Sequence, residues 1–302
     1  MIQLRLPAAV LAAAALATFS ARVSAAPAAR RVENVASPAL AAPVRVLVMT
    51  PPSYDAAPTR RFPVLYFLHD GGGDENVLFR KGVADALDAL MREGSLPEML
   101  VVSPRGVDTW FVDAVDGPRA TSRYATFLTE SLVPFVDARY RTIAARGGRL
   151  VAGISMGGYG ALRWGLAEPA LFCAAGGLSP AIQQLCWPAI EGMPFFIRPS
   201  LKRAFGNDPV RNVLRKNDLY AMLLDDASLA RRAPFLSVRC GTEDKYRLAE
   251  IASFLDRYLG AVGVAHEVVL ETGIHDWPYW RRVLPEFVRA LSTRLSSAEA
   301  AR

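Results

Sequence analysis

Short apolar runs alternate with longer amphipathic stretches along most of this chain. The apolar runs have the length of buried strands and lie at 44–50, 63–69, 98–103, 149–154, 172–178, 234–240 and 266–271. Apolar residues at helical spacing lie between them, at 76–93, 122–139, 157–167, 246–262 and 277–294. Strands that alternate with helices predict an α/β fold, in which helices flank a mostly parallel central sheet and functional loops follow the carboxyl ends of strands.

The most informative motif is Gly153-Ile154-Ser155-Met156-Gly157, between the apolar run 149–154 and the helical stretch 157–167. A strand, G-x-S-x-G and a helix in this order form the context of a nucleophile elbow, in which the serine takes unfavourable backbone dihedrals. The glycines allow the close packing that such a turn requires. The pattern therefore predicts that the Ser155 hydroxyl projects over the edge of the sheet as a nucleophile.

A serine hydroxyl needs a histidine base, and the sequence has three histidines. His69 ends an apolar strand well before the serine. In folds with a nucleophile elbow of this kind, the catalytic residues follow one another along the chain in the order Ser, acid, His. His266 begins the alternating run 266–270 and fits a structural role in a strand. His275 follows that strand in a polar break and is the predicted base.

The base needs a carboxylate that fixes its tautomer and stabilises the imidazolium. The run 234–240 predicts a buried strand, and the loop Gly241-Thr242-Glu243-Asp244-Lys245 follows it. Asp244 is the predicted acid, and the neighbouring Glu243 is the alternative.

An oxyanion hole needs two backbone N–H donors, one from the residue after the serine and one from an earlier strand-to-helix loop. Met156 supplies the first. The second is expected from the glycine-rich loop His69-Asp70-Gly71-Gly72-Gly73-Asp74-Glu75-Asn76. This loop lacks the Lys-Ser/Thr ending of a P-loop and the G-x-G-x-x-G pattern, so nucleotide binding is not expected.

Together these segments resemble the putative-esterase branch of the α/β-hydrolases. That group includes esterase D (S-formylglutathione hydrolase), feruloyl and acetylxylan esterases, tributyrin-type esterases and the antigen 85 mycolyltransferases. The matching segments are 64–76, 102–106 with 110–113, 153–161, 240–244 and 273–277.

The resemblance implies the α/β-hydrolase fold. It also implies a catalytic triad of Ser155, Asp244 and His275, and an oxyanion hole formed by the N–H groups of Met156 and Gly71. No metal or other cofactor is implied.

The glycine-rich loop departs from the family pattern at one position. Asp70 stands where many relatives have glycine, although the mycolyltransferases also carry Asp-Gly nearby. Whether Gly71 or Gly72 donates to the oxyanion therefore stays open.

One connection is much longer than the rest. Residues 181–232 separate two predicted strands and contain Trp187 among several aromatic residues and Leu-rich helical pieces. Such a helical insertion is expected over the active-site edge, as part of an acyl or alcohol pocket. A helical layer that only covers the sheet explains the pattern equally well. Trp110 and Phe111 are further candidates for substrate contacts.

The chain has 302 residues and 52% hydrophobic content, enough for one α/β domain, expected at 44–295. Near the start, Arg5 precedes an apolar run at 7–19 that ends near a small-residue cleavage site. This predicts a signal peptide at 1–25 and a secreted or periplasmic protein; a tethered membrane anchor is the alternative. An Ala/Pro-rich segment, 26–43, follows.

Removing the predicted signal peptide takes away two arginines and lowers the formal charge from +6 to +4. The remaining arginine pairs are scattered, so nucleic-acid binding is not expected.

Three cysteines are too few for a disulfide framework; Cys173 with Cys186 is the most plausible pair, and Cys240 fits a small core residue. No later stretch is long and apolar enough to span a membrane.

The sequence thus predicts a secreted serine esterase that hydrolyses short-chain acyl or carbohydrate-linked carboxylic esters through an acyl-enzyme on Ser155. An acyltransferase of the mycolyltransferase type is the alternative, because the same triad serves both reactions. A non-catalytic carbohydrate-binding relative is disfavoured, because all three triad residues are present.

Overall fold

The computed structural model describes residues 29–114, 122–182, 195, 197–205 and 216–296. Within these residues one sheet of eight strands has the order β1-β2-β4-β3-β5-β6-β7-β8. The strands β4, β3, β5, β6, β7 and β8 run parallel to one another. β2 pairs antiparallel with β4, and β1 pairs antiparallel with β2. Their bounds are β1 Arg30–Val35, β2 Val44–Met49, β3 Val64–Leu68, β4 Leu100–Pro104, β5 Arg149–Ile154, β6 Ala174–Leu178, β7 Phe235–Gly241 and β8 His266–Glu271. The predicted mostly parallel sheet is confirmed.

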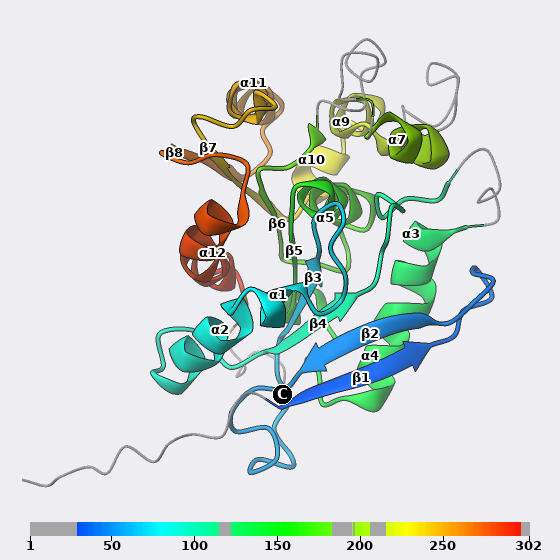
Figure 1. The fold of residues 1–302 in the computed structure, drawn as a ribbon, viewed down its shortest axis with the longest axis vertical. Coiled ribbons are helices and arrows are strands. Elements are labelled where there is room, and N and C mark those ends of the chain that lie inside the picture. The colour runs from blue at the N-terminus through cyan, green and yellow to red at the C-terminus, as the bar shows by residue number, and fades with distance from the viewer. Residues whose placement is uncertain (1–28, 115–121, 183–194, 196, 206–215, 297–302) are drawn as a thin grey trace, which may run out of the picture.

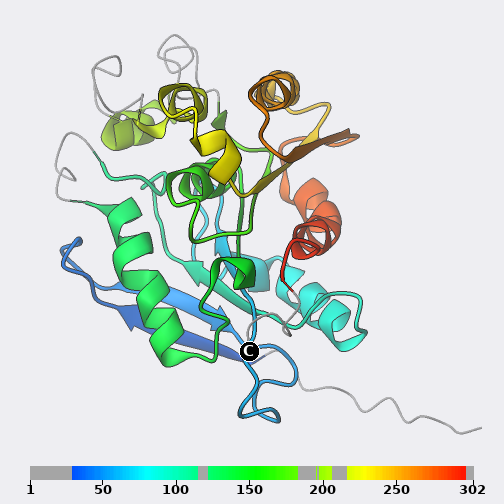
Figure 2. The ribbon, with the colours of Figure 1, turned by 180° about the vertical axis from the view of Figure 1, so that it is seen from behind.

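Helices cover both faces of this sheet (Figures 1 and 2). The described α-helices are α1 Val77–Arg80, α2 Val83–Arg92, α3 Tyr124–Phe127, α4 Val133–Arg139, α5 Met156–Ala167, α7 Arg198–Phe205, α9 Leu219–Asp225, α10 Leu229–Arg232, α11 Leu248–Val262 and α12 Trp277–Ser292. Side chains of α2 and α12 pack in one core with Leu65 and Phe67, and those of α4, α5 and α11 pack in the other with Val64, Tyr66 and Leu68. Successive side chains of a strand point to opposite faces of the sheet, so β3 contributes side chains to both cores.

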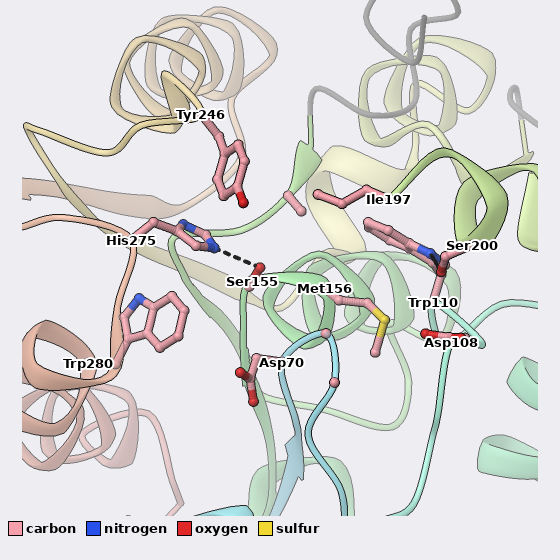
Figure 3. A pocket seen from close by; sticks show the side chains of 13 residues that line it. Asp70, Asp108, Trp110, Ser155, Met156, Ile197, Ser200, Tyr246, His275 and Trp280 are labelled. Atoms are coloured by element: carbon pink, nitrogen blue, oxygen red, sulfur yellow. Dashed lines mark hydrogen bonds between the residues drawn. The ribbon is translucent and has the colours of Figure 1, made fainter. Parts of the chain in front are cut away.

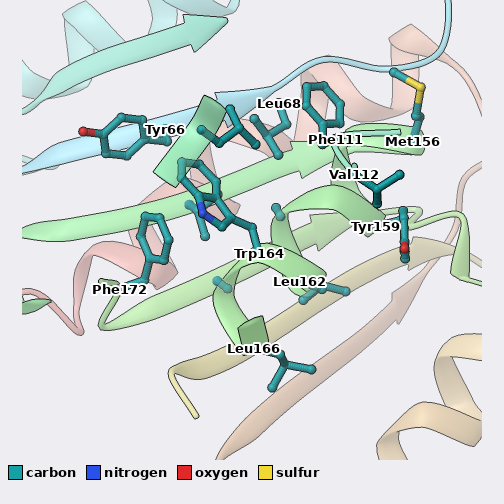
Figure 4. Packing of buried hydrophobic residues seen from close by; sticks show 14 of the residues in the cluster. Tyr66, Leu68, Phe111, Val112, Met156, Tyr159, Leu162, Trp164, Leu166 and Phe172 are labelled. Carbon is teal, nitrogen blue, oxygen red and sulfur yellow. The ribbon is translucent and has the colours of Figure 1, made fainter. Parts of the chain in front are cut away.

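The second core holds the helix that follows Ser155 in place. Trp164 of α5 packs edge-on against Tyr66 of β3 and against Phe172, with ring centroids 5.6 and 4.7 Å away (Figure 4). All three side chains are fully buried. Aromatic pairs of this geometry add to the free energy of folding beyond the area they bury. They fix α5 rigidly on the sheet.

Three elements differ from the sequence-based expectation. Residues 30–35 form β1, an edge strand of the sheet, although the pattern predicted only an Ala/Pro-rich segment over 26–43. The stretch 76–93 is two helices, because Gly82 between them has φ +70°. The stretch 122–139 contains a π-helical turn, Leu128–Leu132.

Parts of the predicted insertion at 181–232 are described, and they form α7, α9 and α10. Figure 1 shows α7 and α9 beyond the end of α5, near the carboxyl ends of the strands. Among the described helices none is long and apolar enough to cross a membrane. The predicted signal peptide, 1–25, lies outside the described residues.

Candidate active site

Ser155 stands at the junction of β5 and α5 with φ 52° and ψ −112°. A positive φ is costly for a residue with a side chain, so neighbouring bonds must hold it. The Ser155 N–H donates to the carbonyl oxygen of Leu178 (2.8 Å), and its own carbonyl oxygen accepts from the N–H of Ala181 (3.1 Å). The end of β6 and the loop after it therefore fix the backbone of the elbow.

The two glycines of the motif are required by close backbone approach. A Cβ atom on Gly153 would lie 2.3 Å from the carbonyl oxygen of Gly157. A Cβ on Gly157 would lie 2.1 Å from the carbonyl oxygen of Leu68 and 2.5 Å from that of His69. Backbone atoms cannot move aside as a flexible side chain can. The elbow is thus packed directly on the end of β3.

The structure brings the three predicted triad residues together. The Ser155 Oγ lies 3.0 Å from Nε2 of His275, and His275 Nδ1 lies 2.6 Å from Oδ2 of Asp244 (Figure 3 draws the first bond). An ionised carboxylate only accepts, so Nδ1–H donates to Asp244 and Nε2 is left to accept the serine proton. This is the tautomer that a general base for Ser155 requires.

Asp244 is well placed to orient the histidine, and its neighbour is not. The Asp244 side chain is fully buried, and its Oδ1 accepts the N–H of Tyr246 (2.9 Å). Glu243 is exposed to solvent. The thiol of Cys240 lies 3.9 Å from Oδ2 of Asp244, and burial together with that carboxylate raises its pKa to about 12. Cys240 therefore stays a neutral thiol beside the acid.

Two aromatic side chains fix the His275 ring. Tyr246 and Trp280 both meet it edge-on, with ring centroids at 4.9 and 4.8 Å. Trp280 is itself held by a hydrogen bond from its Nε1–H to Oγ of Ser179 (3.1 Å). The ring can thus keep its two hydrogen bonds aligned. Tyr246 and Trp280 are not among the residues predicted from the sequence, although each lies close in sequence to a predicted triad residue.

The other two histidines are occupied elsewhere. His69 is fully buried; its Nδ1–H donates to the carbonyl oxygen of Asp70 (2.8 Å), and its Nε2 accepts the N–H of Gly106 (2.8 Å). Burial lowers the pKa of His69, which keeps the ring neutral. His266 lies in β8, with Nε2 3.2 Å from Asp256. Neither ring forms a hydrogen bond with Ser155 in the described structure.

The glycine-rich loop forms a tight turn beside the serine. The N–H of Gly73 donates to the carbonyl oxygen of Asp70 (3.0 Å), and Gly72 has φ +79°. Gly71, Gly72 and Met156 all line the cavity that contains Ser155. The turn uses the N–H of Gly73, and the preceding glycines present their backbone to the cavity. Both predicted oxyanion donors, Met156 and Gly71, therefore border the same space as the nucleophile.

The cavity has a volume of about 370 Å³. Its walls come from widely separated parts of the chain, namely the glycine loop, the elbow, the acid and histidine loops, and the insertion (Figure 3). The described lining residues are Asp70, Gly71, Gly72, Asp108, Trp110, Ser155, Met156, Ala181, Ile197, Ser200, Tyr246, His275 and Trp280. This is close to the lower end of the range of ligand pockets, roughly 300–1,000 Å³.

The predicted substrate contacts have different outcomes. Trp110 lines the cavity, whereas Phe111 does not. Phe111 is fully buried and packs so closely on two glycines that a Cβ on Gly106 would lie 2.3 Å from its ring and one on Gly160 would lie 2.8 Å away. The backbone at Trp110 and Phe111 has positive φ, which turns the two side chains in ways that a sequence pattern does not reveal. Trp187 lies outside the described residues.

The insertion is tied to the cavity wall at two points. Trp110 Nε1–H donates to Oγ of Ser200 in α7 (2.8 Å), and Arg203 of α7 forms an ion pair with Asp108 (3.0 Å). The Trp110 ring also packs 5.9 Å from that of Phe205. Ala181, Ile197 and Ser200 of the insertion therefore belong to the wall of the cavity, whereas α9 and α10 do not line it.

The described residues contain no group of three or more His, Cys, Asp or Glu side chains that could hold a metal ion. Cys173 has a free thiol in the structure, and Cys186 lies outside the described residues.

Residues 37–291 match the family model described as "Putative esterase". The chain belongs to this family. The match covers most of the chain and includes Ser155, Asp244 and His275.

Two curated relatives align with part of the chain. "Esterase MT1326" of Mycobacterium tuberculosis (strain CDC 1551 / Oshkosh) is 35% identical over 119 residues, which are 39% of this chain and 25% of the relative. "Endo-1,4-beta-xylanase/feruloyl esterase" of Xylanibacter ruminicola is 31% identical over 113 residues, 37% of this chain and 16% of the relative. The chain thus matches a quarter or less of each relative's length.

A solved structure titled "ferulic acid esterase" superimposes with a TM-score of 0.74 and 22% identity. The superposition covers 89% of this chain and 99% of the other. The likeness at this identity shows the fold, which is that of the α/β-hydrolases.

Proposed function

We propose that this protein is a secreted serine carboxylic-ester hydrolase that acts on short-chain acyl or carbohydrate-linked esters. The observation on which this rests is the continuous hydrogen-bonded chain from Ser155 through His275 to the buried Asp244, at the wall of one cavity. Membership of the esterase family supports carboxylic esters as the substrate class.

In the proposed reaction, His275 Nε2 removes the Ser155 proton while Oγ attacks the ester carbonyl carbon. The C=O electron pair moves to the carbonyl oxygen, which the N–H groups of Met156 and Gly71 stabilise. Collapse of this intermediate expels the alcohol, which takes the proton from His275. Water then attacks the acyl-enzyme by the same route, and the acid product leaves. Asp244 stabilises the imidazolium that forms in each half.

The size and lining of the cavity support a short acyl group. Its described volume of about 370 Å³ has to admit the acyl group and part of the alcohol. Trp110, Ile197 and Met156 supply an apolar wall, and Asp108 and Ser200 supply polar atoms. Such a mixed lining suits acetyl or aryl esters on carbohydrate better than a long lipid chain. The curated relative that combines xylanase with feruloyl esterase in its name also favours a carbohydrate ester.

A substrate panel tests this proposal. p-Nitrophenyl esters from acetate to palmitate, acetylated xylan and methyl ferulate are assayed in parallel, with and without a sugar acceptor. We expect the highest kcat/KM on a short acyl or carbohydrate-linked ester, and no measurable turnover above background by Ser155→Ala. Maximal turnover on palmitate would refute the short-acyl preference. Accumulation of a new sugar ester would instead identify an acyltransferase. Export is tested separately, by finding whether the mature protein made in its host begins near residue 26.

A further inference from the structure

A second pocket lies beside Trp277, at the start of α12. Its volume is about 410 Å³, and it is open to solvent. The described lining residues are Phe79, Arg80, Lys81, Gly82, Trp277, Pro278 and Arg281. Three of these side chains are cationic and none is a carboxylate. The pocket therefore differs in character from the serine cavity, and the proposed catalytic steps do not use it.

The three cations differ in how far carboxylates match their charge. Arg80 donates to both carboxylate oxygens of Asp74, at 2.5 and 2.7 Å, so its charge is matched. The ammonium of Lys81 lies 5.2 Å from the centre of the Trp277 ring, and the guanidinium of Arg281 lies against Gly82. Among the described residues neither Lys81 nor Arg281 forms an ion pair. Burial raises the pKa of the Asp70 carboxyl, and Lys81 lies close enough for its charge to lower that pKa in part, although the two form no ion pair. The pocket thus presents the charge of Arg281, and that of Lys81 in part, to an anion.

The backbone adds to this positive potential. Gly82 is the N-cap of α2, and Trp277 and Pro278 begin α12, so the amino-terminal ends of two helices border the pocket. Amino-terminal ends of helices favour negative charge. Two carboxylates offset part of this potential. Asp276 caps α12 and accepts the N–H of Tyr279 (3.0 Å), and Asp85 lies exposed in the first turn of α2; neither of them lines the pocket. An anionic ligand is therefore favoured over a neutral or cationic one.

The remaining lining is flat and apolar. The indole of Trp277 and the ring of Pro278 form part of the wall next to the two cations. A sugar ring has an apolar C–H face that can lie on an indole, while a carboxylate at its edge can reach Lys81 and Arg281. A bare inorganic anion would leave the aromatic surface unused.

One hydrogen bond connects a residue that lines the second pocket with a residue that lines the active-site cavity. Trp277 Nε1–H donates to Oδ2 of Asp70 (3.1 Å), and Asp70 lines the cavity that contains Ser155. Trp277 also follows His275 by two residues. A carbohydrate chain esterified at one sugar could therefore place the ester at Ser155 and a neighbouring sugar in the second pocket.

We propose that the pocket formed by Lys81, Trp277 and Arg281 binds the carboxylate of an acidic sugar residue, a uronic acid, in the carbohydrate part of the substrate. Its role in catalysis rests on the proposed function, but binding in the pocket can be measured without turnover.

The test titrates ¹⁵N-labelled protein with D-glucuronate, D-glucose and acetate at equal ionic strength. The readout is the indole N–H signal of Trp277, which is assigned by its loss in Trp277→Phe. We expect saturable shifts with D-glucuronate and weaker binding of both other probes. Lys81→Met and Arg281→Gln should each weaken glucuronate binding about three- to fivefold, the size expected for one exposed charge pair.

Arg282→Gln is the matched control. It removes the same charge from the next residue of α12, but Arg282 donates to the carbonyl oxygen of Thr272 and does not line the pocket. Its affinity for D-glucuronate should equal that of the wild type. An equal loss in Arg282→Gln, equal affinity for acetate and glucuronate, or no saturable shift of the Trp277 signal would each overturn the proposal. Activity on p-nitrophenyl acetate, measured in parallel on the wild type, reports separately on the proposed ester hydrolysis.

Discussion

Replacing Gly157 with alanine should disrupt the packing of the elbow on β3. The new Cβ would lie 2.1 Å from the carbonyl oxygen and 2.4 Å from the carbonyl carbon of Leu68, and 2.5 Å from the carbonyl oxygen of His69. All three are backbone atoms at the end of a central strand. Relief of the overlap therefore requires α5 or the end of β3 to shift, and the end of β3 leads directly into the glycine-rich loop.

The expected magnitude follows from two opposing effects. Overpacking in a well-packed core costs about 1–3 kcal/mol or more, and the rigid backbone contacts place Gly157→Ala at the upper end. Alanine recovers about 1 kcal/mol of helix propensity relative to glycine. The net loss is therefore about 2 kcal/mol or more. A domain of about 250 residues loses roughly 2–4 °C in Tm per kcal/mol, so a fall of at least about 4–8 °C is expected.

Gly158→Ala is the matched control on the same helix. Its Cβ would lie 3.2 Å from its nearest neighbours, so small shifts suffice and the gain in helix propensity offsets much of the cost. Thermal and urea unfolding of both variants should show Gly158→Ala within about 3 °C of the wild type. Gly157→Ala should unfold much earlier and lose kcat/KM because the oxyanion loop moves. A Gly157→Ala protein with the stability and activity of the wild type would refute the packing argument.

Three further predictions concern the titratable groups. Asp244→Asn should keep its Tm but lose several orders of magnitude in kcat, whereas Glu243→Gln should retain activity; the reverse result would exchange the two roles. His275→Ala should abolish measurable turnover of p-nitrophenyl acetate and His266→Ala should not, and a silent His275→Ala would exclude it as the base. Since burial lowers the pKa of His69, the unfolded state binds the proton more readily, so urea midpoints should fall as pH drops below about 6.5. This slope should flatten in His69→Gln; an unchanged slope would contradict the linkage.

The regular elements were predictable where the chain is fully buried. The strand predicted at 149–154 is β5 and the one predicted at 63–69 contains β3, because buried strands in a parallel sheet produce recognisable runs. The strand at 30–35 was missed because an edge strand exposes most of its residues, and Arg30–Val35 is charged or polar at four of six positions. These polar residues leave no apolar run from which the strand could be predicted.

The meeting of the three candidate triad residues was predictable from the order of the strands. Ser155, Asp244 and His275 each follow a strand of the parallel part of the sheet, and parallel strands bring their carboxyl ends to one edge of the sheet. The groups that shape the cavity lack such a rule. Asp108 and Arg203 are 95 residues apart and meet only because α7 folds back over the 108–111 loop. The burial of Phe111 depends on a local backbone conformation with positive φ, which no apolar pattern encodes.

The central claim is that Ser155 is the nucleophile of an acyl-transfer reaction. Diethyl p-nitrophenyl phosphate tests it directly, because an activated serine attacks the phosphorus and displaces p-nitrophenolate, leaving a stable diethylphosphoryl ester. Intact-mass measurement and peptide mapping should find one adduct per chain, on the peptide that contains Ser155, with parallel loss of esterase activity. Ser155→Ala should remain unmodified. An adduct on any other residue, or equal labelling of Ser155→Ala, would contradict the assignment.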